Sequence, residues 1–62
     1  MKEKIVTFNS IYEGSQYTMN AKHMILIDVQ GKYYMQHSYL PTLCVKIDDT
    51  TYANLMEIVK HL

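Results

Sequence analysis

Three histidines and one cysteine are the residues of this 62-residue chain whose side chains most readily bind a metal ion or attack a substrate. His23 and His37 would face each other on two predicted strands, and Cys44 or His61 could supply a third ligand. Catalytic zinc needs three protein ligands and structural zinc four, and the chain has no short-spaced pair such as C-x-x-C. We therefore predict no metal site and interpret His23 and His37 as ordinary histidines at strand ends.

The other residues do not form a catalytic pattern. Cys44 lies in the apolar segment LCVKI, which favours a small strand residue over a nucleophile. The only two glycines, Gly14 and Gly31, cannot form a glycine-rich loop around a phosphate. We predict that the chain is not an enzyme, and we expect no cofactor and no small-molecule substrate.

The charged residues argue against nucleic acid as the main partner. Six lysines balance six acidic side chains, so the formal net charge is zero, and there is no arginine. Arginine is preferred for bidentate contacts to guanine and phosphate, whereas lysine supplies only a point charge. The lysines are also scattered along the chain instead of forming a basic stripe.

The length and the N-terminal segment indicate a small cytoplasmic protein. The segment MKEKIVTF contains only a short apolar run, so we expect no secretory signal. No window approaches the roughly 18 apolar residues of a membrane span, and a single cysteine suits a reducing compartment. We expect residues 1–62 to form a single domain of marginal stability, for which association with itself or a partner would supply the missing stabilisation.

The hydrophobic pattern predicts strands followed by one helix. Residues 4–8 predict a strand with Val6 and Phe8 on one face, and residues 9–16 predict a loop. The further predicted strands cover residues 17–28, 32–39 and 43–47.

Residues 48–62 predict a helix, because their apolar side chains recur at helical spacing. The stripe consists of Tyr52, Leu55, Met56, Val59 and Leu62. Asp48, Asp49, Thr50 and Thr51 offer an N-cap, and Glu57 and His61 lie one turn apart on the solvent face. The expected fold is α+β: a small antiparallel sheet of three or four strands with one C-terminal helix packed on one face.

Residues 29–31 connect two of the predicted strands and set their register. A loop of all three residues, with Gly31 in the left-handed conformation, would pair Asp28 with Lys32, which is a favourable opposite-charge pair. A two-residue turn would instead pair Asp28 with Tyr33 and lose that ion pair. A slip of one residue turns every side chain of a strand to the other face. We predict the three-residue loop.

This register predicts two apolar sheet faces. The helix-facing side would carry Ile25, Ile27, Tyr33, Met35, Leu43, Val45 and Ile47. The second side would carry Met24, Leu26 and Tyr34, although the open side of an antiparallel sheet is normally polar. Either the N-terminal strand or the loop of residues 9–16 folds over the second side, or another molecule covers it.

We predict a partner-binding surface that consists of Met24, Leu26, Tyr34, Tyr39 and Leu40. The chain has six tyrosines, and tyrosine is favoured at protein interfaces. Tyrosine also suits strands and can cover a thin core while its hydroxyl stays in water. Both interpretations of the tyrosines remain open.

The segment CVKIDDTTYANLMEIVKHL (residues 44–62) resembles the strand and first helix of ribbon-helix-helix repressors. In that family a strand is followed by Asp, by Asp or Glu, and by a helix with Tyr and Leu. The resemblance implies that outward strand residues read bases, and these map onto Cys44 and Lys46. The chain departs from the family pattern because the sequence ends at Leu62, without the second helix that forms the family's dimer.

From these observations we predict a non-enzymatic protein-binding module that acts as an inhibitor or adaptor through a tyrosine-rich sheet face. Its partner would be another protein, a second copy of itself in a homodimer, or both. The small size and the lysine-only basic set are similar to those of accessory proteins of phages and mobile elements. The alternative prediction is a small nucleic-acid-binding transcriptional regulator that uses the ribbon-helix-like C-terminal segment.

Overall fold

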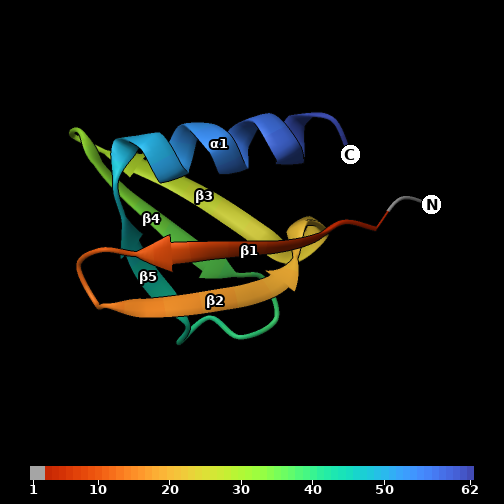
Figure 1. Ribbon diagram of the computed structural model, residues 1–62, viewed down its shortest axis with the longest axis horizontal. Helices are drawn as coiled ribbons and strands as arrows, with labels where there is room; N and C mark the ends of the chain where they lie inside the picture. The colour runs from red at the N-terminus through yellow and green to blue at the C-terminus, as the bar shows by residue number, and fades with distance from the viewer. Residues whose placement is uncertain (1–2) are drawn as a thin grey trace.

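The computed structural model describes residues 3–62, which form strands, a short 3-10 helix and one α-helix (Figure 1). In chain order these elements are β1 (Ile5–Ser10), β2 (Ser15–Asn20), η1 (Ala21–His23), β3 (Met24–Val29), β4 (Lys32–His37), β5 (Cys44–Ile47) and α1 (Asp49–Lys60).

The predicted α+β fold is confirmed. Strands β3, β4 and β5 form an antiparallel three-stranded sheet in that order, and β1 and β2 form a separate antiparallel pair. The second sheet was not expected, because residues 9–16 were predicted as a loop and residues 17–28 as one strand. The loop is shorter than predicted, since Ser10 ends β1 and Ser15 begins β2. The long strand is interrupted by η1, whose N-cap Asn20 accepts a hydrogen bond from the Lys22 backbone N–H.

The β1–β2 hairpin has one apolar and one polar face. Val6 and Phe8 are buried on the same side of β1, as predicted. On the opposite side, the hydroxyls of Thr7 and Thr18 hydrogen-bond at 2.9 Å in an exposed position. The buried Ser10 hydroxyl donates to the backbone carbonyl of Lys46 at 2.7 Å and so attaches the end of β1 to β5.

The helix predicted over residues 48–62 is confirmed as α1, and of the four candidate caps Asp48 is the N-cap. The Asp48 carboxylate accepts hydrogen bonds from the backbone N–H and the hydroxyl of Thr51, the latter at 2.6 Å. These hydrogen bonds, first that of the Thr51 hydroxyl, hold the pKa of Asp48 below its ordinary value. On the solvent face, the predicted proximity of Glu57 and His61 is confirmed by a hydrogen bond of 2.9 Å.

The core-facing stripe of α1 is centred on Leu55, which is buried. Tyr52, Ile58 and Val59 pack against the core beside it. The prediction that Met56 and Leu62 belong to this stripe is wrong, because both side chains are exposed. The helix contacts the core through a narrower arc than predicted, and Leu62 lies beyond the last helical residue.

The core lies between the three-stranded sheet and a layer formed by α1 and the β1–β2 hairpin. In Figure 1, α1 and β1 run beside each other across the three-stranded sheet. The buried apolar cluster draws on β1, η1, the three strands of the larger sheet and α1: Val6, Phe8, Ala21, Met24, Met35, Val45, Ile47 and Leu55. The Ala21 backbone N–H donates to the Lys4 carbonyl at 2.8 Å, which joins η1 to the start of β1. Val6, Phe8 and Leu55 therefore cover the same side of the β3–β4–β5 sheet, and on the other side Tyr12 of the β1–β2 loop contacts Lys46 of β5.

The turn between β3 and β4 contains two residues, not three. Gln30 and Gly31 have φ angles of 52° and 80°, and two consecutive positive φ angles are the mark of a type I′ hairpin turn. Val29 pairs with Lys32, and Asp28 pairs with Tyr33. The predicted three-residue loop and its Asp28–Lys32 pair are therefore wrong.

The two-residue turn forms because its geometry outweighs the Asp28–Lys32 ion pair that the longer loop would allow. An exposed cross-strand ion pair contributes only about 0.2–1 kcal/mol, whereas the I′ turn matches the twist of both strands. The two registers bury different apolar side chains of β3, Met24 and Leu26 in the observed one and Ile25 and Ile27 in the predicted one, so the turn geometry and not apolar burial separates them.

The register error inverts one strand. Met24 and Leu26 lie on the helix-facing side, and Ile25 and Ile27 lie on the opposite side, the reverse of the prediction. The other two strands are oriented as predicted. Tyr33, Met35, Val45 and Ile47 face the helix layer, and Tyr34 faces away.

The N-cap predicts a specific pH dependence of stability. Because the folded pKa of Asp48 is depressed, its contribution is present above the unfolded pKa of about 3.9 and is lost as pH falls through the folded pKa. We expect Asp48→Ala to lower Tm by a constant amount between pH 5 and 7, and by progressively less below about pH 3.9. Thermal unfolding of the unmodified chain and of the Asp48→Ala variant across this pH range measures the difference in Tm. A Tm difference that is the same at low and at neutral pH would contradict the assigned role.

Candidate protein-binding site

The face of the β3–β4–β5 sheet that points away from α1 is here called the outer sheet surface. It is formed by alternate residues of the three strands: Ile25, Ile27, Val29, Lys32, Tyr34, Gln36, Cys44 and Lys46. One cross-strand row consists of Ile27, Tyr34 and Lys46, which are consecutive partners in the sheet.

The β3 side of the outer sheet surface is apolar and open. Ile25 is 44% exposed and Val29 is 52% exposed, and Ile27 and Tyr34 are half-buried. The open side of an antiparallel sheet is normally polar. A line of three β-branched apolar residues on this side therefore indicates a surface that binds something.

The β5 side of the outer sheet surface is polar and partly fixed by local contacts. The Lys46 ammonium lies 4.5 Å from the centroid of the Tyr12 ring, in a cation–π contact. The Gln36 side-chain amide donates to the Pro41 carbonyl at 3.0 Å. The outer sheet surface carries two lysines and no carboxylate, and its apolar part is confined to β3 and the middle of β4.

Strand β3 also has a free hydrogen-bonding edge. Within residues 3–62 it pairs with β4 alone. The backbone N–H of Ser38 donates to the carbonyl of His23 at 2.8 Å, so odd-numbered residues bond to β4 and even-numbered ones point away from it. The N–H and C=O groups of Leu26 and Asp28 therefore point outward. The Met24 N–H is bonded to the Ala21 carbonyl, and only the Met24 C=O adds to the edge.

The edge of β3 has few of the features that normally prevent strand pairing. Natural edge strands carry lysines, prolines, bulges or inward charges. The sequence of β3 is MILIDV, and its single charged residue, Asp28, lies on the helix-facing side near the end of the strand and is the one such feature in β3. The outward backbone groups and the apolar line of Ile25, Ile27 and Val29 thus form one continuous site along β3.

The structure separates the five predicted site residues into three groups. Tyr34 lies on the outer sheet surface, as predicted. Tyr39 and Leu40 lie in the β4–β5 loop and are 73% and 55% exposed. Met24 is in the core and Leu26 packs against it, so neither side chain is on the outer sheet surface.

The loop residue Tyr39 is held near the start of β3. Its ring packs edge-on against His23 with centroids 4.8 Å apart, and its backbone N–H donates to His37 Nδ1 at 3.1 Å. Tyr39 therefore lies beside His23, the residue before β3, whereas Tyr34 lies across from Ile27.

Sequence reasoning missed Ile25, Ile27 and Val29 as site residues. The signal that would have found them is the Gln30-Gly31 dipeptide, since glycine at the second position is typical of a two-residue turn. A two-residue turn pairs Ile27 with Tyr34 and so puts these three residues on the side that the sequence predicts for Tyr34.

The histidines lie close together without forming a metal centre. The rings of His23 and His37 are 5.4 Å apart between centroids, although His37 pairs with Met24 in the sheet, not with His23 as predicted. Cys44 is an exposed free thiol. Among residues 3–62 there is no group of three or more His, Cys, Asp or Glu side chains that could hold a metal ion.

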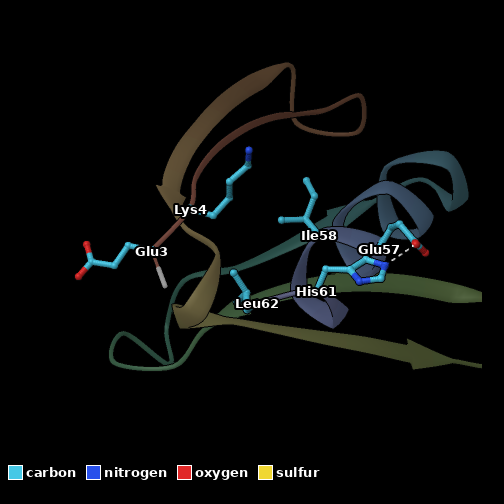
Figure 2. Close-up of a pocket in the computed structure, with 6 residues that line it drawn as sticks. All are labelled: Glu3, Lys4, Glu57, Ile58, His61 and Leu62. Atoms are coloured by element: carbon cyan, nitrogen blue, oxygen red, sulfur yellow. Dashed lines mark hydrogen bonds and ion pairs between the residues drawn. The ribbon is translucent and has the colours of Figure 1, made fainter. Parts of the chain in front are cut away.

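A hollow of about 400 Å³ lies between the start of β1 and the C-terminal end of α1 (Figure 2). It is lined by Glu3, Lys4, Glu57, Ile58, His61 and Leu62. The Glu57 and His61 side chains hydrogen-bond to each other along the helix, as the dashed line in Figure 2 marks. The hollow lacks the convergent polar groups that fix a small ligand, and we do not take it as the candidate site.

Comparison of the chain with protein-family models, with curated proteins and with solved structures finds no match. In the part of the chain that the structure describes, no helix has the length and apolar character needed to cross a membrane.

Two lysine substitutions at neighbouring positions test which side of β3 is outside. Met24→Lys places a charge in the core and should lower the free energy of unfolding by about 3 kcal/mol or more. Ile25→Lys changes an exposed side chain and should alter the free energy of unfolding by about 0.5 kcal/mol or less. Urea unfolding at low protein concentration measures both. The opposite ranking, with Ile25→Lys the more damaging, would contradict the observed register.

Proposed function

We propose that this chain is a non-enzymatic protein-binding module that binds an extended polypeptide segment as an additional strand along β3. The observation that carries the proposal is the free edge of β3, where outward backbone groups of Leu26 and Asp28 lie beside the exposed Ile25 and Val29. In strand addition, backbone hydrogen bonds supply affinity and alternate side chains supply specificity. Both contributions are available at this edge.

The bound segment would extend the outer sheet surface beyond β3. On that side its side chains would pack beside Ile25, Ile27 and Val29, which favours apolar residues at alternate positions. Each backbone hydrogen bond contributes about 0.5–1.5 kcal/mol net, and each large apolar side chain that becomes buried contributes about 1.5–3 kcal/mol. After the cost of ordering the segment, a few such contacts give an affinity of about micromolar.

A module of this kind acts as an inhibitor or an adaptor, because it binds a partner without changing it chemically. The exposed free thiol of Cys44 supports a place in the reducing cytoplasm. The contribution of Tyr39 and Leu40 would be to extend the binding surface at the start of β3, where Tyr39 contacts His23.

The nucleic-acid alternative gains no support from this geometry. Lys46, one of the two residues that the ribbon-helix-helix resemblance maps onto base reading, lies over the Tyr12 ring. Its strand, β5, pairs with β4 of the same chain. The outer sheet surface offers two lysines to a phosphate backbone, and arginine is absent from the chain.

Two substitutions of Asp28 test strand addition with matched side-chain loss. Asp28 is exposed and its N–H points away from β4, so Asp28→Pro removes an outward donor without removing a β3–β4 hydrogen bond. Asp28→Ala removes the same carboxylate and keeps the N–H. Against extended peptides selected from a display library on the unmodified chain, we expect Asp28→Pro to weaken binding about tenfold and Asp28→Ala about twofold or less.

Fluorescence anisotropy with labelled peptides measures both affinities, and circular dichroism verifies that both variants are folded. Equal affinities for Asp28→Pro and Asp28→Ala, or a library that yields no binding peptide, would overturn the proposed function.

A further inference from the structure

We propose that a second copy of this chain occupies the β3 edge, so that two β3 strands pair antiparallel around a two-fold axis at Leu26. This inference rests on the proposed function, since it uses the same edge. It goes further by naming the occupant and the register.

The outward backbone groups are complementary to themselves. With Leu26 opposite Leu26 of the second copy, each donates its N–H to the carbonyl of the other. Asp28 of each copy then lies opposite Met24 of the other copy, and the Asp28 N–H donates to that Met24 carbonyl. The Met24 N–H is already bonded to Ala21 and is not needed. This register therefore uses every free donor of the edge and forms four hydrogen bonds across the axis.

The side chains on the outer sheet surface also match. In this register Ile25 lies opposite Ile27 of the second copy, at a pair without backbone hydrogen bonds, where side chains approach most closely. Two such pairs bring four isoleucines together on the surface that is otherwise exposed to water. Apolar β-branched cross-strand pairs of this kind stabilise a sheet.

The charges do not oppose the pairing. Asp28 is the single charge on β3, and it faces Met24 rather than a second Asp28. Lys32 and Lys46 are on β4 and β5, one and two strands away from β3. The chain has a formal net charge of zero, so no long-range repulsion hinders the approach of two copies.

The result is a continuous six-stranded sheet with both α1 helices on the same face. The interface is isologous, because the same strand is used on both chains, and association closes at two copies. Pairing also gives a domain of only 62 residues additional buried surface. A partner segment that binds at β3 would compete with the second copy.

Disulfide trapping tests the occupant and the register together. In a Cys44→Ser background, Ile25→Cys and Ile27→Cys chains are prepared separately and then mixed under mild oxidation. At a non-hydrogen-bonded pair the Cα atoms lie about 4.5 Å apart, within the range that a disulfide spans. We expect the mixture to form a 25–27 cross-link at least about tenfold faster than either chain alone or an exposed Thr18→Cys control.

Sedimentation equilibrium of the unmodified chain should give twice the 7.3 kDa chain mass. Cross-linking of Ile25→Cys with itself, faster than in the mixture, would overturn the register. A monomer mass at every concentration together with no cross-link above the control would overturn the homodimer. If such a monomer still binds a labelled peptide of residues 23–29, and the Asp28→Pro variant does not bind that peptide, the homodimer is wrong and the proposed function stands. If it binds no extended peptide, both are overturned.

Discussion

The backbone conformation of the Gln30–Gly31 turn determines the arrangement of the whole three-stranded sheet. Both residues have positive φ angles, 52° and 80°, and this I′ geometry leaves no freedom in the pairing of Val29 with Lys32. The left-handed conformation of Gln30 costs about 1 kcal/mol relative to glycine. This cost is offset by the match between the twist of a type I′ turn and the twist of the two strands that it connects.

The register decides which side of β3 is covered. The buried side chains of the covering elements lie on the same side, Leu55 from α1 and Val6 and Phe8 from the β1–β2 hairpin. On the other side, Tyr12 of the β1–β2 loop contacts Lys46 of β5. The hairpin is attached by the hydrogen bonds from Ser10 to Lys46 and from Ala21 to Lys4. The outer sheet surface and the β3 edge therefore remain available, and the proposed strand addition and self-pairing both follow from that availability.

Much of the fold could be predicted from the sequence, because several signals are local. The periodicity around Leu55 and the acidic N-cap predict α1, and alternation predicts the burial of Val6 and Phe8. The site could not be predicted in the same way. Its side depends on a single residue of register, and an exposed Asp28–Lys32 pair is too weak to decide it. Tyr34 was assigned to the outer sheet surface because β4 was correctly oriented, whereas β3 was inverted.

Nuclear Overhauser contacts between Hα protons of β3 and β4 test the central claim most directly. In an antiparallel pair, the Hα protons of non-hydrogen-bonded partners are the closest across the strands. The two-residue turn predicts strong Hα–Hα contacts between Leu26 and Met35 and between Asp28 and Tyr33. Hα–Hα contacts between Ile25 and Met35 and between Ile27 and Tyr33 would contradict the register. They would place Leu26, not Ile25 and Ile27, on the outer side, and both proposals would lose their structural basis.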